Sequence, residues 1–199
     1  MAKPNKTRYA LLGFLSMQDA TGYDIKKLME RSTNNFWRET DSSIYPILKQ
    51  LLDENMVRCT IENKDSDKPK KIYSITHDGY REFLNWLSEP PVFEQYRNEL
   101  LLKVFFGWNL DKKITIDHIR RFQHQSLMID EKYKAIEKNA PPIETRTNEQ
   151  LYQYLTLKAG MALSEARLKW SKEAIKLLEA RALSSPNLKK SPKKKASKK

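Results

Sequence analysis

The chain has 199 residues, of which 39% are hydrophobic and 31% charged, and it contains a single cysteine, Cys59. One cysteine excludes an internal disulfide, no apolar run approaches the ~20 residues of a membrane span, and residues 1–9 lack the apolar stretch of a signal peptide. We therefore expect a cytoplasmic protein without a membrane segment. The net charge is +12, but residues 189–199 carry seven of the lysines, so total charge alone does not establish a nucleic-acid partner.

The first two helices are predicted from apolar spacing and from a capping signal. Residues 7–17 repeat apolar side chains at helical intervals, and residues 18–21 read as a turn. Thr21 is followed three residues later by Asp24, which is the spacing of a capping box. A second helix is therefore expected from Thr21 to about residue 32.

The third helix is the most informative segment of the sequence. Asp41 or Ser42 can cap it, and Pro46 falls in its first turn, where a missing N–H costs little. We expect its buried face to consist of Ile44, Leu48, Leu51 and Leu52. Ser42, Tyr45 and Lys49 then share another face, with groups that can bind phosphates and base edges. An ordinary solvated face explains the same spacing.

After the third helix the apolar spacing changes from helical to alternating. Residues 57–61 and residues 71–75 each alternate apolar with polar side chains, which predicts a β-hairpin. Thr76 can cap a fourth helix, which Pro90 stops. We expect the inward face of that helix to consist of Tyr80, Phe83, Leu84 and Leu87. Three helices, a hairpin and a closing helix form the order of a winged helix-turn-helix.

The second half of the chain predicts helices only. Residues 100–108 carry apolar side chains at helical spacing, and residues 119–136 repeat them in heptad steps. Thr147 and Gln150 form a capping box for a last helix that runs to about residue 183. The fold class is therefore mostly α with a small β-hairpin. We expect a DNA-binding domain over 1–90, a helical dimerisation domain over 91–183 and a disordered basic tail over 184–199.

The last helix carries two neighbouring apolar stripes. One stripe suffices to pack the helix onto its own domain, and a second left in water would form a patch that soluble monomers avoid. We therefore expect a homodimer with a two-fold contact. The residues predicted for this dimerisation surface are Leu157, Met161, Leu163, Leu168, Trp170, Ile175 and Leu178.

Patterns for catalysis and metal binding are absent from the sequence. The three histidines lack metal-ligand spacing, and Cys59 lies on the inward face of a predicted strand, which is typical of a small core residue. Nucleophile-elbow, phosphate-loop and dinucleotide motifs are also absent. We therefore expect no enzyme, no metal and no cofactor. Trp170, Tyr152 and Tyr154 can be read as an effector pocket or as plain packing.

Lysines around the predicted hairpin favour DNA binding. A basic loop beside a recognition helix is the expected form of a wing that holds the phosphate backbone. Asp65 and Asp67 in the same loop oppose this interpretation. The residues predicted to contact DNA are Ser42, Ser43, Tyr45, Lys49, Lys64, Lys68, Lys70 and Lys71.

An ordered set of short motifs in the first half resembles the PadR family of regulators. The matching segments are YALLG at 9–13, GYDI at 22–25, FW at 36–37, SIYP at 43–46 and KPKKIYSIT at 68–76. The resemblance implies a bacterial transcriptional repressor that binds a palindromic operator, double-stranded DNA, as a homodimer. It also implies release by a small molecule, which in some members is a phenolic acid. A transcriptional activator and a winged-helix module for protein interaction remain as alternatives.

Overall fold

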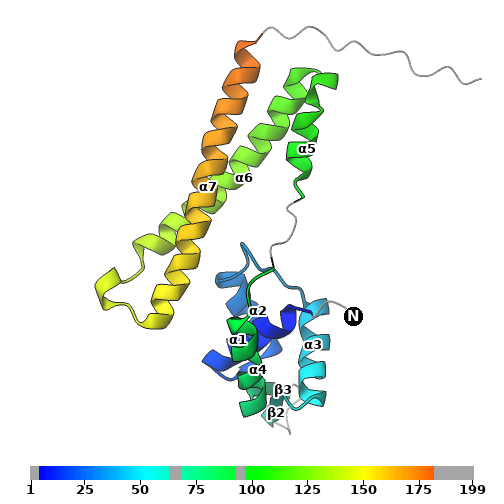
Figure 1. The fold of residues 1–199 in the computed structure, drawn as a ribbon, viewed down its shortest axis with the longest axis vertical. Helices are drawn as coiled ribbons and strands as arrows, with labels where there is room; N and C mark the ends of the chain where they lie inside the picture. The colour runs from blue at the N-terminus through cyan, green and yellow to red at the C-terminus, as the bar shows by residue number, and fades with distance from the viewer. Residues whose placement is uncertain (1–4, 63–68, 93–96, 182–199) are drawn as a thin grey trace, which may run out of the picture. The chain divides into compact units, whose positions relative to one another are not determined.

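The computed structural model describes residues 5–62, 69–92 and 97–181. The chain divides into two compact units, Met1–Glu94 and Gln95–Lys199. The first unit holds four helices and a small sheet, and the second holds helices in its described part (Figure 1). The expected fold class, mostly helical with an N-terminal winged helix-turn-helix, is confirmed.

The first unit is built from helices α1 (Thr7–Met17), α2 (Gly22–Arg31), α3 (Asp41–Asp53) and α4 (His77–Ser88). Its fully buried side chains come from the first three helices and from the start of β2. They are Leu11, Leu12, Leu15, Ile25, Ile44, Leu48, Leu51 and Val57. The sheet and α4 close this core from the other side, with Tyr73 buried and Phe83 packed against it.

The sheet has three antiparallel strands in the order β1-β3-β2, not the two of the predicted hairpin. Strands β2 (Val57–Glu62) and β3 (Lys70–Ile75) pair as expected. The additional strand β1 (Ala20–Thr21) pairs Ala20 with Tyr73 and Thr21 with Ile72. Thr21 also caps α2, because its hydroxyl accepts from the backbone N–H of Asp24 at 3.1 Å. The predicted capping box is therefore present, and one residue ends a strand and starts a helix.

Three local expectations in the first unit need correction. The cap of α3 is Thr40, not Asp41 or Ser42, because Asp41 already begins the helix. Leu52 is 36% exposed, and Ile47 is buried in its place, since the buried face follows 44, 47, 48 and 51. Of the four residues expected on the inward face of α4, only Phe83 packs against the core, whereas Tyr80, Leu84 and Leu87 are exposed.

The second unit consists of α5 (Glu99–Phe105), α6 (Lys112–Lys138) and α7 (Asn148–Ala180), with short 3-10 turns at Gly107–Asn109 and Ile143–Thr145. The helix expected over 100–108 therefore ends before Trp108, which lies in the first of these turns. The capping box of Thr147 and Gln150 is present at the start of α7.

Helices α6 and α7 pack side by side as a long hairpin (Figure 1). Small residues on α7 allow the close approach. The hydroxyl of Ser164 is buried and donates to the carbonyl of Ser126 at 3.1 Å. Gly160 lies under the ring of Tyr133, so that a Cβ there would come within 2.6 Å of the phenol. Ile136, the last residue of the predicted heptad series, is exposed.

The two apolar stripes of α7 have different surroundings. The stripe that faces α6 is partly buried within the chain and consists of Leu157, Met161, Leu168, Ile175 and Leu178. The other stripe exposes Leu155, Leu163 and Leu177 by 56%, 59% and 72%. Trp170 is half-buried and makes an edge contact with Phe122, their ring centroids 6.0 Å apart.

Candidate nucleic-acid interface

The outer face of α3 carries the side chains that the sequence predicts for DNA contact. Ser42, Tyr45 and Lys49 are exposed, and Leu48 on the opposite side is buried. Tyr45 is 47% exposed, and its ring packs over Gly22, where a Cβ would lie 2.7 Å from the ring. The first residue of α2 therefore helps to fix where the phenol points.

Ser43 differs from its neighbours on this helix. Its side chain is half-buried, and its hydroxyl donates to the carboxylate of Glu39 at 2.6 Å. The same oxygen accepts from the backbone N–H of Thr40 at 3.0 Å. Within the protein alone, Ser43 therefore holds the start of α3, and its predicted DNA contact stays a prediction.

An ion pair bridges the two helices of the helix-turn-helix. The ammonium of Lys26 on α2 lies 2.6 Å from the carboxylate of Asp41 at the start of α3. Its hydrogen bond to Asp41 raises the pKa of Lys26 above its ordinary value. The pair neutralises the charge of a carboxylate in the first turn of α3.

The wing strands place their lysines on two different faces. In the register of β2 and β3, Lys70 lies opposite Glu62, and Lys71 lies opposite Ile61. Because successive strand residues alternate between faces, Lys71 shares the face of the buried Tyr73, whereas Lys70 lies on the other face. Both lysines are exposed. Lys64 and Lys68 lie outside the described residues.

Arg58 is a cation that the sequence analysis did not include. It is exposed on β2 opposite Ser74, on the same sheet face as Lys70. Its position one residue after the buried Val57 is the signal that could have found it, because alternation places every second residue of a strand outward.

Arg8 joins three elements of the first unit. Its guanidinium donates to both carboxylate oxygens of Glu82 on α4, through Nη2 at 2.7 Å and through Nε, and it also pairs with Glu54 just after α3. The bond to Glu82 raises the pKa of Arg8 above its ordinary value, against the opposing effect of burial. Two-point binding fixes the guanidinium plane, so this contact holds α1, α3 and α4 in a defined arrangement.

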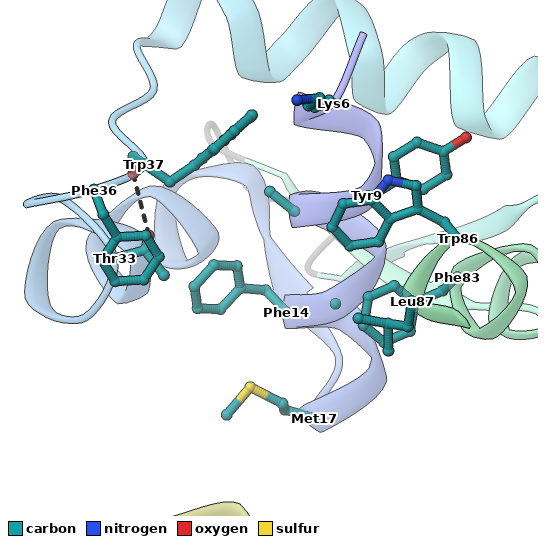
Figure 2. Close-up of a pocket in the computed structure, with 12 residues that line it drawn as sticks. Lys6, Tyr9, Phe14, Met17, Thr33, Phe36, Trp37, Phe83, Trp86 and Leu87 are labelled. Atoms are coloured by element: carbon teal, nitrogen blue, oxygen red, sulfur yellow. Dashed lines mark hydrogen bonds between the residues drawn. The ribbon is translucent and has the colours of Figure 1, made fainter. Parts of the chain in front are cut away.

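A pocket of about 310 Å³ opens on the first unit beside α1. Its walls come from α1, from the connection between α2 and α3, and from the end of α4 (Figure 2). Lys6 is the one charged side chain among the described residues that line it. The lining residues are Lys6, Tyr9, Ala10, Gly13, Phe14, Met17, Thr33, Phe36, Trp37, Phe83, Trp86 and Leu87.

Aromatic residues make up half of the pocket lining. Figure 2 shows Phe36 and Trp37 on one side of Phe14, with Tyr9 and Trp86 on the other. Tyr9 and Trp86 stack with ring centroids 4.6 Å apart and an interplanar angle of 3°. Burial raises the pKa of Tyr9 above its ordinary value. The sequence analysis did not predict this pocket, because its walls come from three segments that share no periodic pattern.

The aromatic residues considered for a pocket in the second half lie elsewhere. Trp170 packs against Phe122, and Tyr152 is 72% exposed. Tyr154 is covered by the guanidinium of Arg146, 3.7 Å from the ring centroid. None of these three residues lines the pocket beside α1.

The described segments contain neither a metal-binding cluster nor a membrane-spanning helix. Among residues 5–62, 69–92 and 97–181, no three histidine, cysteine, aspartate or glutamate side chains are grouped so as to hold a metal ion. No helix within the same residues is both long and apolar enough to cross a membrane.

Known proteins similar to this chain cover nearly all of it. The family described as "Transcriptional regulator PadR-like family" matches residues 11–85, and the family described as "Virulence activator alpha C-term" matches residues 96–179. The negative transcriptional regulator PadR of Bacillus subtilis (strain 168) is 25% identical over 177 residues, which make up 86% of this chain and 97% of that protein.

Solved structures share the fold over most of their length. Bacillus subtilis PadR in complex with operator DNA has a TM-score of 0.78 and 23% identity, covering 87% of this chain and 99% of that one. The same protein in complex with p-coumaric acid has a TM-score of 0.72 and 25% identity, covering 88% and 99%. The Vibrio cholerae virulence activator AphA has a TM-score of 0.74 and 24% identity, covering 88% and 99%.

Proposed function

We propose that this chain, which belongs to the PadR-like family of transcriptional regulators and is not an enzyme, represses transcription. It binds a palindromic operator as a homodimer. It leaves the DNA when a small aromatic compound binds. The observation that carries this proposal is the outer face of α3, where Tyr45 and Lys49 point away from a core that holds Leu48. The Bacillus subtilis relative is a negative regulator whose structures hold operator DNA and p-coumaric acid, which supports both parts. Binding to chromosomal DNA makes a cytoplasmic location part of the proposal.

Recognition requires α3 to enter the major groove. Ser42, Tyr45 and Lys49 then meet base edges and phosphates, and the positive end of the helix dipole adds to the attraction. Lys70 and Arg58 on the outer face of the wing, and Lys71 on the inner face, bind phosphates without reading sequence. Lys64 and Lys68 are assigned the same role from their place in the sequence.

Two copies of α3 must meet successive major grooves about 34 Å apart, which requires a dimer. The stripe of Leu155, Leu163 and Leu177 is an apolar surface that its own hairpin leaves open. We assign the partner contact to this stripe, with Trp170 at its edge. The other stripe supports this contact indirectly, because it packs α7 onto α6. It consists of Leu157, Met161, Leu168, Ile175 and Leu178.

The pocket beside α1 is our candidate site for the aromatic effector. About 310 Å³ matches the lower range of small-molecule sites. The stacked rings of Tyr9 and Trp86 favour a flat apolar ligand.

Salt dependence of DNA binding tests the assignment of α3. Lys49→Ala should weaken binding to a fragment from the regulated promoter about tenfold and reduce the salt slope by about one unit, since one phosphate contact is lost. Lys172→Ala, an exposed lysine of α7, is the matched control and should change neither quantity.

The same titration separates the proposal from its alternatives. If Lys49→Ala retains full affinity and slope, α3 is not the reading helix. If the unmodified protein binds promoter and random DNA equally weakly, with a flat salt dependence, the winged helix serves protein interaction instead.

A further inference from the structure

The segment between α2 and α3 contains a carboxylate that joins the pocket wall to the start of the recognition helix. We propose that Glu39 is a positioning residue that transmits occupancy of the pocket beside α1 to the first turn of α3. The effector half of this inference rests on the proposed function, whereas the link itself rests on hydrogen bonds within the first unit.

Three side chains donate to the Glu39 carboxylate. The hydroxyl of Thr7 and the indole N–H of Trp37 both donate to Oε1, at 2.6 and 2.9 Å. The hydroxyl of Ser43 donates to Oε2 at 2.6 Å. The donors come from α1, from the pocket wall and from α3, so one half-buried carboxylate fixes three segments relative to one another.

The pocket side of this link depends on the Trp37 ring. The Trp37 backbone is held by Thr33, since its N–H donates to the Thr33 carbonyl at 2.7 Å and its carbonyl accepts from the Thr33 hydroxyl at 3.2 Å (Figure 2). With the Trp37 backbone held in this way, we expect a ligand that presses on this wall of the pocket to shift the indole ring. Displacement of the indole removes its N–H from Oε1 of Glu39.

The helix side of the link depends on Ser43. Its hydroxyl oxygen accepts from the N–H of Thr40, the cap of α3, and has two acceptors within reach, Oε2 of Glu39 at 2.6 Å and the carbonyl oxygen of Thr40 at 2.8 Å. A shift of the Glu39 carboxylate therefore reorients the group that closes the first turn of α3. Ser42 and Tyr45 stand beside this turn on the proposed DNA face, so their positions change with it.

Hydrogen exchange in the DNA-free protein tests the link. Trp37→Phe keeps an aromatic pocket wall, removes the indole N–H and shortens the ring by the same amount as the control below. It should speed amide exchange across residues 40–48 about threefold to tenfold, the factor for one lost hydrogen bond. Glu39→Ala should do the same, and the two changes together should add nothing further. Trp86→Phe is the matched control, because Trp86 lines the same pocket but stacks on Tyr9.

A conservative replacement distinguishes positioning from general loss of packing. Glu39→Gln keeps an acceptor for Trp37 and can donate to the Ser43 hydroxyl, so it should restore slow exchange. Unchanged exchange at residues 40–48 in Trp37→Phe, or an equal increase in Trp86→Phe, would overturn the link.

Release from DNA supplies the functional readout, with p-coumaric acid as the probe. Glu39→Ala should bind p-coumaric acid within about twofold of the unmodified protein but should lose most of the ligand-induced drop in promoter affinity. If release persists undiminished in Glu39→Ala, Glu39 does not transmit occupancy. If the unmodified protein neither binds p-coumaric acid nor is released by it, that effector assignment fails, and the exchange experiment still decides the link.

Discussion

Replacing Leu163 by glutamate should separate the proposed dimer while the hairpin of α6 and α7 stays folded. Leu163 is 59% exposed in the single chain, and Leu155 and Leu177 on the same stripe are exposed by 56% and 72%. Full burial of a leucine contributes roughly 1.5–3 kcal/mol, so covering the exposed part of each gives about 1–2 kcal/mol. Six such leucines in a two-fold contact contribute about 6–12 kcal/mol before the cost of association.

The substitution acts twice because the contact is two-fold. Two leucines lose about 2–4 kcal/mol of burial, and two carboxylates would have to leave water within an apolar surface. The dimer dissociation constant should therefore rise at least 100-fold, since each tenfold step corresponds to about 1.4 kcal/mol. Promoter affinity should fall with it, because one winged helix alone meets only one half-site.

Sedimentation equilibrium and circular dichroism together test this prediction. The variant should sediment as a monomer at micromolar concentration with unchanged helix content. Lys169→Glu, on the charged side of α7, is the control and should remain dimeric. A Leu163→Glu protein that dimerises as tightly as the unmodified chain would show that the open stripe is not the partner surface.

Three further predictions concern stability. Gly79→Ala should destabilise the first unit by about 1–3 kcal/mol in chemical denaturation, because its Cβ would lie 2.1 Å from the carbonyl oxygen of Met56; unchanged stability would mean that α4 can shift. A hydrogen bond from Gln50, one turn earlier, is the main cause that lowers the pKa of Glu54 below its ordinary value of 4.5. The charged carboxylate therefore contributes its full stabilisation of the fold above pH 4.5, and this contribution disappears as the pH falls through the lowered pKa. Glu54→Gln should therefore reduce the loss of stability between pH 5 and 3, and an identical pH profile would refute the assignment. Gly160→Ala should weaken the hairpin of α6 and α7, since its Cβ would meet Tyr133 at 2.6 Å, and a higher melting temperature would contradict this.

Local signals in the sequence predicted the helix starts that depend on near neighbours. Thr21, Thr76 and Thr147 cap α2, α4 and α7 as expected, because a cap requires only a side-chain oxygen and a backbone N–H two or three residues later. The start of α3 was predicted one or two residues late, since Thr40, Asp41 and Ser42 are all residue types that can cap a helix.

Features that depend on distant segments were not predictable in this way. The strand of Ala20 and Thr21 is too short to show alternation, and only its pairing with β3 makes it a strand. The pocket walls lie on three segments, and Glu39 appears in the sequence as one more acidic residue in a connection. The outward position of Leu52 depends on how α3 packs, because helical periodicity allows the buried face to include either 47 or 52.

The double role of Thr21 limits how this domain can be rebuilt. The wing is held at its base by a residue that also caps the scaffold helix in front of the recognition helix. A wing exchanged between relatives as the hairpin alone would lose its third strand, and an insertion directly after Thr21 would separate the cap from its helix. Ala20 and Thr21 must therefore be transferred with the hairpin in any chimaera, so the smallest transplantable wing comprises two stretches of chain with about 35 residues between them.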